Sequence, residues 1–241
     1  MNSKVALIIG AGTSLGSSIT KVFADDNFTV VPVRREGEKL KPLEEEINSK
    51  GGKCFSFSLD ARKEDEVQNF IQRVELEIGE IEIAIYNIGA NIKYNLTETS
   101  SKKYFKVWEM ATFGAFLMGR EVAKNMIKRK RGTIIFTGAT ASKRGGSGFA
   151  AFSSAKFGLR ALAQSLAREL GPKGIHVAHT IIDGAIDHPW IKENFPDTYK
   201  LKEVDGILNP DHIAEAYYNL HLQKKTAWTH ELDLRPYMEK F

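Results

Sequence analysis

The chain has 241 residues, 42% hydrophobic and 27% charged, and 34 basic side chains against 30 acidic ones give a net charge of +4. This length and composition predict a single globular domain spanning residues 1–241. Charges of both signs are interspersed, and the one dense basic run, 128–131, closes a helical stretch before Gly132, where solvated cations complement a helix C-terminus. We therefore expect no nucleic-acid partner, and the sequence predicts no metal site.

Cysteine usage and hydropathy bear on the compartment. Cys54 is the only cysteine, which excludes an intramolecular disulfide and fits a reducing environment. The apolar run after Lys4 covers about six residues and ends in glycines without a cleavage pattern. No stretch approaches the roughly 20 apolar residues that a membrane-spanning helix needs. We expect a cytoplasmic protein that does not contact a membrane.

Apolar runs of strand length alternate with helical patterns along the chain. Strands are expected at 4–9, 28–33, 53–59, 81–87, 132–138 and 174–182, with a last one around 228–234. Helices are expected at about 15–26, 38–50, 63–78, 100–130 and 150–170, and a further helix should be capped by Asn209 and begin at Pro210. This alternation predicts an α/β fold, a doubly wound parallel sheet with helices on both faces.

Residues 183–208 interrupt this alternation. They carry glycine, proline, aspartate and aromatic residues without a clear period. A substrate lid and a long surface loop are both consistent with such a segment.

The segment 8–16 has the pattern of a strand that enters a glycine turn and then a helix. Gly10 permits a tight turn, and Gly16 permits close approach of helix and sheet. Backbone N–H groups at the start of that helix can hold a pyrophosphate, which makes cofactor-binding residues of Gly10, Thr13, Ser14, Leu15 and Gly16. Its place at the first strand of the alternating pattern favours a dinucleotide site.

The end of the second strand discriminates between the two nicotinamide dinucleotides. An acidic residue there would bind the ribose 2′-hydroxyl of NAD, whereas this chain has Arg34 and Arg35. Guanidinium groups pair well with a 2′-phosphate. The predicted cofactor is therefore NADP(H) rather than NAD(H).

Several motifs in order give the chain a family resemblance. After the glycine turn come "LDA" at 59–61, an Asn-Ile-Gly turn from Asn87 to Gly89, the pair Phe152 and Lys156, and "IDGAIDHP" at 182–189. Over nearly its whole length the chain resembles the short-chain dehydrogenase/reductase family. The resemblance implies a Rossmann-type, seven-stranded sheet with strand order 3-2-1-4-5-6-7.

The resemblance also implies roles for individual residues around the cofactor. Asp60 matches the residue that contacts the adenine amino group, and Ala61 is its backbone neighbour. Asn87 and Gly89 match the turn beside the adenosine ribose.

Two further positions belong to the nicotinamide end. Gly184 and Ile186 match the loop that contacts the nicotinamide carboxamide, although the family's usual proline before that glycine is Asp183 here. The middle glycine of the family's phosphate turn is replaced by Ser14, which brings a side chain close to the phosphates.

The catalytic positions depart from the family. The usual tyrosine is Phe152, the usual serine is Ala139, and the usual asparagine falls on Ala111. Lys156 is retained, and it can bind the nicotinamide ribose without the tyrosine. An enoyl-reductase variant places its tyrosine seven residues before the lysine, and that position is Phe149.

Other polar residues are candidates for the missing proton donor, although for each of them the favoured interpretation is an ordinary loop or turn residue. They are Thr140, Ser142, Asp183, Asp187 and His188, with Tyr94 and Tyr104 near the expected substrate entrance.

Two functions stay open at this stage. The first is an NADP(H)-dependent oxidoreductase with an atypical proton-donor site, acting on a small carbonyl, alcohol or activated alkene. The second is a catalytically silent NADP(H)-binding protein that serves as a sensor, scaffold or partner subunit. In either case the apolar positions Ala155, Leu159, Leu162, Ala163 and Leu166 are too many for one helix face, which favours a homodimer or homotetramer.

Overall fold

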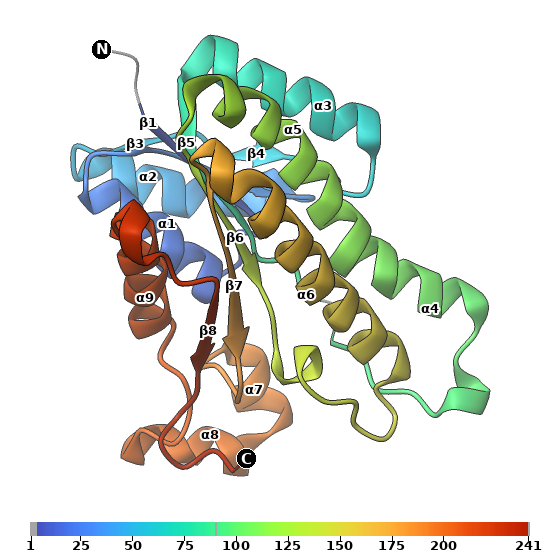
Figure 1. Cartoon of the computed structure of the whole chain (residues 1–241). Coiled ribbons are helices and arrows are strands. Elements are labelled where there is room, and N and C mark those ends of the chain that lie inside the picture. Colours follow the sequence, from blue (N-terminus) through green and yellow to red (C-terminus); the bar gives the residue numbers. More distant parts are fainter. Residues whose placement is uncertain (1–3, 90, 241) are drawn as a thin grey trace.

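Buried apolar strands form the centre of the molecule, which the computed structural model describes for residues 4–89 and 91–240 (Figure 1). The strands are β1 (Lys4–Ile9), β2 (Thr29–Arg34), β3 (Lys53–Cys54), β4 (Phe57–Ser58), β5 (Glu80–Tyr86), β6 (Thr133–Thr137), β7 (His176–Ile182) and β8 (Glu231–Leu234). All pairings are parallel, in the order β3-β2-β1-β5-β6-β7-β8, with β4 also on β2. Since β3 and β4 are two parts of the third strand, the predicted order 3-2-1-4-5-6-7 is confirmed.

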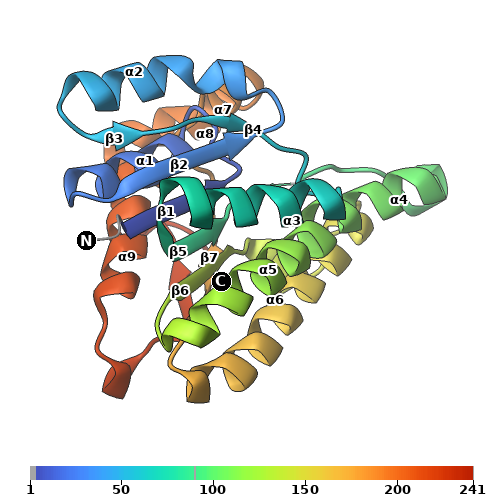
Figure 2. The ribbon, with the colours of Figure 1, turned by 90° about the horizontal axis from the view of Figure 1, so that it is seen from above.

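Helices cover both faces of the sheet, as Figures 1 and 2 show. One face carries α1 (Leu15–Asp25), α2 (Lys41–Ser49) and α9 (Pro210–Leu222), and the other carries α3 (Glu64–Arg73), α5 (Gly114–Arg129) and α6 (Ala150–Leu170). α4 (Ser101–Trp108) packs on α6, while α7 (Pro189–Asn194) and α8 (Pro196–Lys200) lie beyond the carboxyl ends of β7 and β8. The two-faced α/β class is therefore confirmed.

The expected long helix at 100–130 is interrupted by a π-helical turn, Glu109–Phe113, between α4 and α5. The Tyr86 hydroxyl donates to the Met110 carbonyl oxygen at 2.6 Å, and Thr112 Oγ1 donates to the Ala155 carbonyl oxygen at 2.6 Å. Such turns are found where side chains intrude on the regular helical hydrogen bonds. A second π turn, Val74–Ile78, extends α3 to the expected end of that helix.

The third strand is also broken, between Cys54 and Phe57. Ser56, in the gap, turns its backbone N–H toward the Glu44 carboxylate of α2, 3.3 Å away. Its hydroxyl bonds the same carboxylate. The continuous strand predicted at 53–59 is wrong because Pro32 of β2, which lies opposite this gap, has no backbone N–H to donate to the third strand.

The basic run at 128–131 is not simply a solvated helix end. Arg129 forms a two-pronged ion pair with Glu75 at 2.6 and 3.0 Å and donates to the Ile81 carbonyl oxygen at 3.0 Å. Arg131 Nε lies 2.9 Å from a Glu82 carboxylate oxygen. The prediction of solvated charges is wrong for Arg129, which is largely buried, whereas Arg131 is exposed as predicted. Both arginines connect the end of α5 to its neighbours.

The segment 183–208 contains more regular structure than its sequence suggests. Pro189 and Pro196 begin α7 and α8, and Ile186 then bridges to Leu208. The Asn209 side chain accepts from the Asp211 backbone N–H at 2.8 Å, which confirms the predicted cap of α9.

Two general features complete the fold. Among the residues that the structure describes, no helix is both long enough and apolar enough to cross a bilayer. Within the same residues, no three histidine, cysteine or carboxylate side chains gather in an arrangement that could hold a metal ion.

A buried charge network fastens the edge strand β8 to its neighbours. His179 on β7 is fully buried, and its Nδ1 lies 3.1 Å from Glu231 Oε2 on β8. Arg160 of α6 forms a bidentate ion pair with the same carboxylate, with N–O distances of 2.6 and 2.7 Å. Burial lowers the pKa of His179 to about 4, and the nearby Lys156 and Arg160 charges act in the same direction, although Glu231 opposes them.

This network predicts a loss of stability in mild acid. Because the unfolded chain takes up the His179 proton near pH 6.5 and the folded chain only near pH 4, that stability is complete above pH 6.5 and disappears as the pH falls toward 4. The His179 contribution to the free energy of unfolding is about 3 kcal/mol. Urea unfolding between pH 7 and 5 should show a shallower pH slope for His179→Asn than for the parent. The exposed His212 provides the control His212→Asn, whose slope should equal that of the parent.

Candidate active site

The turn between β1 and α1 has the geometry of an anion cradle. Gly10 has φ +96°, and a Cβ on it would lie 2.6 Å from the Asn87 carbonyl oxygen. A Cβ on Gly16 would lie 2.6 Å from the Ala11 Cα atom, so neither position admits a side chain. Gly12 faces open space, and the N-cap of α1 has no side-chain hydrogen bond. The first N–H groups of α1 are therefore directed at the turn, where a phosphate would bind.

Beside this turn lies a cavity of about 260 Å³ at the carboxyl ends of β1, β2 and β5. It contains most of the residues predicted from the sequence to surround the adenosine half of a dinucleotide. Its lining includes Gly10, Arg34, Arg35, Asp60, Ala61, Asn87 and Gly89. The structure thus brings together residues that the sequence spreads over eighty positions.

Arg34 ends β2 and is half-buried, while Arg35 is exposed. Glu36, the next residue, pairs with Lys39 at 2.5 Å rather than with either arginine. Both guanidinium groups therefore remain available to an anion in the cavity.

Asn87 connects the end of β5 to the phosphate turn. Its backbone N–H donates to the Ile9 carbonyl oxygen at 2.8 Å, and its side-chain amide donates to the Gly10 carbonyl oxygen at 3.2 Å. Gly89 next to it is open, with nothing within 4 Å of a built Cβ. This arrangement leaves open space beside Gly89, where the resemblance expects a ribose.

Arg62 is a cavity residue that the sequence reasoning missed. Its Nε and Nη2 donate to the two Asp60 carboxylate oxygens at 2.8 and 2.5 Å, and its Nη1 lies 3.7 Å from Glu109. The hydrogen bonds from Arg62 hold the pKa of Asp60 below its ordinary value. The two-residue spacing of an acidic and a basic residue after a strand was the available signal. Arg62 fixes the Asp60 carboxylate and links the cavity to the π turn at Glu109.

Lys156 of α6 lies at the other end of the site and is buried, with 2% of its surface exposed. Its ammonium group donates to the Thr137 carbonyl oxygen at 2.8 Å and to the Ile88 carbonyl oxygen at 3.3 Å. Burial lowers its pKa to about 8. The Phe152 ring centroid is 5.9 Å from Nζ, so the helix places both residues on one face, as the spacing of four predicts.

Apolar side chains pack together at the positions that the resemblance assigns to the family's proton-transfer residues. Ala111, Phe152 and Ala155 belong to one buried hydrophobic cluster, and Ala139 and Phe149 pack against it. The cluster replaces the three polar groups of the family pattern with close packing.

The polar residues just beyond β6 and β7 already have partners. Thr140 Oγ1 donates to Asp183 Oδ1 at 2.5 Å, and Asp183 lies 3.3 Å from Arg235. The Asp183 backbone N–H also donates to Leu234 at 2.8 Å, a bond that the family's proline could not make. Ser142 is completely buried and accepts from the Ala139 backbone N–H at 3.1 Å.

The remaining candidates lie on the 183–208 segment and at the expected entrance. Asp187 pairs with Lys202 at 2.6 Å, and His188 Nδ1 accepts from the Trp190 backbone N–H at 2.9 Å to cap α7. Tyr94 and Tyr104 are exposed. None of these groups is bonded to Lys156, so a role for any of them as the acid stays a prediction.

The nicotinamide loop is held by the C-terminal segment. Gly184 has φ +145°, and a Cβ there would lie 2.9 Å from Pro236 Cδ. Ile186 bridges to Leu208. A contact between Gly184 or Ile186 and a nicotinamide stays a prediction.

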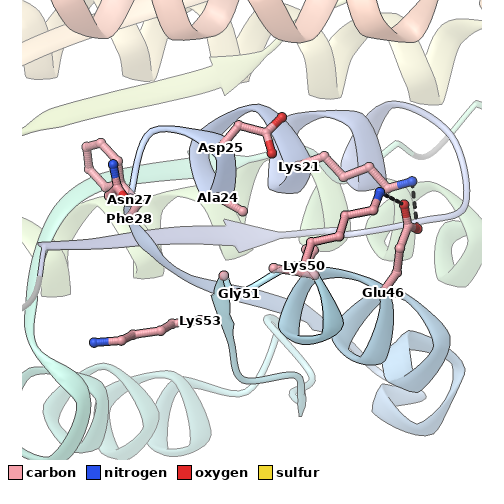
Figure 3. Close-up of a pocket in the computed structure, with 11 residues that line it drawn as sticks. Lys21, Ala24, Asp25, Asn27, Phe28, Glu46, Lys50, Gly51 and Lys53 are labelled. Carbon is pink, nitrogen blue, oxygen red and sulfur yellow. Dashed lines mark hydrogen bonds and ion pairs between the residues drawn. The ribbon is translucent and has the colours of Figure 1, made fainter.

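A larger cavity, about 380 Å³, lies at the amino ends of β2 and β3, between the C-terminal ends of α1 and α2 (Figure 3). The Glu46 carboxylate there is 2.8 Å from both Lys21 and Lys50, so each of these ammonium groups already has an ion-pair partner. The carbonyl ends of the two helices disfavour an anion. The smaller cavity is therefore the one whose chemistry fits a phosphorylated cofactor.

The family-level comparison agrees with this geometry. The family model described as short chain dehydrogenase matches residues 4–198. The chain therefore belongs to the short-chain dehydrogenase/reductase family.

Individual relatives place the chain within that family. It is 48% identical to a short-chain dehydrogenase from Rhodopseudomonas palustris, whose crystal structure superposes with a TM-score of 0.84 over 97% of this chain and 99% of that one. A metagenomic short-chain oxidoreductase in complex with NADP is 25% identical, with a TM-score of 0.83 and 98% of both chains covered. The 3-oxoacyl-[acyl-carrier-protein] reductase of Bos taurus is 26% identical over 200 residues, 80% of this chain and 83% of the relative.

Proposed function

We propose that the protein is an NADP(H)-dependent oxidoreductase with an atypical proton-donor site. The observation that carries this proposal is the cavity at the carboxyl ends of β1, β2 and β5, which is lined by the residues expected to bind a dinucleotide and whose wall residue Ile88 accepts a hydrogen bond from the buried Lys156. A structurally similar family member in complex with NADP supports the choice of cofactor. A cytoplasmic location also remains our expectation.

The chain's own groups would hold the cofactor as follows. The N-terminus of α1 and the glycine turn bind the diphosphate, and Arg34 and Arg35 bind the 2′-phosphate. Lys156 orients the nicotinamide ribose, since its ammonium group can give up a carbonyl partner for a ribose hydroxyl. When bound, the cofactor supplies the hydride.

The apolar cluster around Phe152 selects among acceptors. Reduction of a ketone leaves an alkoxide that needs an adjacent proton donor and hydrogen-bond donors. Hydride addition to an activated alkene leaves an enolate, which is a weaker base and needs the donor less. Of the two substrate classes, an activated alkene therefore fits this site better than a small carbonyl compound. Lys156, whose pKa burial lowers to about 8, is a charged donor beside the cluster, with Nζ 5.9 Å from the centroid of the Phe152 ring.

A second candidate function is cofactor binding without turnover, as a sensor, scaffold or partner subunit. The observation that favours it is the close packing of Ala111, Ala139 and Phe152, which leaves no hydroxyl at any of the three family positions. The two functions predict different behaviour of the same variants.

We predict that NADPH binds more tightly than NADH. Replacing both arginines, Arg34→Ala and Arg35→Ala, should weaken NADPH about 10- to 100-fold, because charge-assisted hydrogen bonds to the 2′-phosphate are lost, and should leave NADH unchanged. Calorimetric titration measures both affinities. Lys53→Ala, at the amino end of β3, is the matched control and should change neither. Equal affinities of the parent for the two cofactors would refute the assignment.

We predict that the parent oxidises NADPH with at least one enone or other activated alkene. The double variant Ala139→Ser and Phe152→Tyr restores a hydroxyl pair beside Lys156, so it should gain reduction of ketones while NADPH affinity changes less than about threefold. A panel of ketones, aldehydes and enones, followed by NADPH absorbance, compares the two proteins.

The panel also separates the two candidate functions. Parent turnover that Lys156→Met abolishes, with the fold intact by circular dichroism, excludes the silent binder. Tight NADPH binding without parent turnover, and activity only in the double variant, excludes the enzyme for that panel.

We also propose that the protein assembles as a homodimer or homotetramer through the outer face of α4 and α5. Of the helix positions expected to face a partner, Ala155, Leu159 and Ala163 lie in the protein's own core. The exposed apolar groups are instead aromatic: Phe105 is 58% and Trp108 37% exposed. They form a continuous row with Phe113 and Phe116, with ring centroids 5.9 to 6.2 Å apart. Such a row is typical of a buried interface.

This assembly predicts that charge on the aromatic row yields monomers. Phe105→Glu with Phe116→Glu should lower the mass measured by light scattering at micromolar concentration to that of one chain. Leu76, which is 77% exposed at the end of α3, supplies the control Leu76→Glu, which should keep the parent mass. A monomeric parent would contradict the proposal.

A further inference from the structure

One hydrogen bond joins the phosphate turn to the 183–208 segment. The Ser14 hydroxyl donates to the Asp187 carbonyl oxygen at 2.8 Å, across 173 positions of sequence. Ser14 is the residue that replaces the middle glycine of the family pattern, and a glycine could not make this bond. The substitution thus adds a direct contact between the cofactor cradle and the segment beside it.

Asp187 lies where the two ends of that segment meet. We call this point, formed by residues 185–187 and Leu208, the neck. The Asp187 backbone N–H donates to the Leu208 carbonyl oxygen at 2.8 Å, and the Leu208 N–H donates to the Ala185 carbonyl oxygen at 2.8 Å. The Asp187 carboxylate pairs with Lys202 inside the segment. A hydrogen bond to the Asp187 carbonyl oxygen therefore stabilises the position of both ends of the segment.

A second serine attaches the far side of the neck to the same helix. Ser18, one turn along α1, donates to Asp211 Oδ1 of α9 at 2.5 Å. The two serines differ in their surroundings: Ser14 occupies the N-cap position at the phosphate turn, whereas Ser18 lies one turn further from it. Of these two, Ser14 is the one placed to exchange its partner for a phosphate.

We propose that Ser14 is a positioning residue whose single hydroxyl proton holds the neck of the 183–208 segment until a diphosphate lies in the turn. A serine hydroxyl has one proton to donate, so it cannot serve the Asp187 carbonyl and a phosphate together. A hydrogen bond to a charged phosphate is roughly twice as strong as one to a neutral carbonyl. The proton therefore turns to the phosphate, and the neck is released. This inference rests on the proposed function, since it needs a diphosphate cofactor in the turn.

Hydrogen exchange followed by mass spectrometry tests the release directly, because the neck amides of Asp187 and Leu208 are hydrogen-bonded. The probe is 2′-phosphoadenosine 5′-diphosphoribose, which has the diphosphate but no nicotinamide to contact the segment. It should raise exchange in peptides covering 185–208 by about three- to tenfold, the loss expected for one hydrogen bond. Adenosine 2′-monophosphate, which lacks the diphosphate, should leave exchange unchanged.

Variants separate the switch from a merely structural bond. Ser14→Ala should show the raised exchange without any ligand and no further rise with the diphosphate probe. Ser14→Thr keeps a hydroxyl and should behave as the parent. Ser18→Ala is the matched control: it should raise exchange near Asp211 in all states and keep the parent's response at the neck.

Calorimetry with the same probes distinguishes a failure of this inference from a failure of the proposed cofactor function. If the diphosphate probe binds and neck exchange in the parent does not rise, or rises equally in Ser14→Ala, the inference is overturned. If the probe does not bind the parent at all, the proposed cofactor function fails, and the switch fails with it.

Discussion

Lys156 is held by carbonyl oxygens that follow two different strands, and much of the site depends on this interaction. The Thr137 carbonyl comes from the end of β6 and the Ile88 carbonyl from the turn after β5, so one ammonium group joins α6 to both. A buried ammonium without such partners would be strongly destabilising. The lysine therefore has a structural reason to remain whether or not a tyrosine stands beside it, and its retention alone does not decide between an enzyme and a binder.

The two halves of the site have followed different constraints. At the phosphate end, Gly10 and Gly16 admit no side chain, and the cavity gathers the residues expected to surround a dinucleotide. At the other end, the family's hydroxyl and amide positions are filled by methyl groups and a phenyl ring that pack as a core. The polar cavity and the apolar cluster are thus built from separate groups of residues.

Much of the fold follows from short-range patterns. The strand order, the glycine turn and the Asn209 cap could all be predicted, because each depends on residues adjacent in sequence or on one family pattern. The π turn at Glu109–Phe113 could not, because local helix preference is continuous there and the interruption comes from Tyr86, more than twenty residues away. The contact of His179 with Glu231 and the hydrogen bond from Ser14 to Asp187 could not be predicted either, because each joins residues far apart in the sequence. Within the site, Arg62 had a local signal, but its contact with Glu109 did not.

The π turn also decides which way the aromatic row faces. A regular α-helix turns about 100° per residue, so Trp108 and Phe116 would lie nearly a quarter-turn apart on an uninterrupted helix. The wider turn at Glu109–Phe113 removes most of that offset and stacks Trp108 on Phe113 and Phe113 on Phe116. Deleting a single residue inside the turn would therefore restore a regular helix on which Trp108 and Phe116 lie seven positions apart, offset by only about 20° and still on one face. The helical register at this one point sets the shape of the outer surface and also places Ala111 beside Phe152.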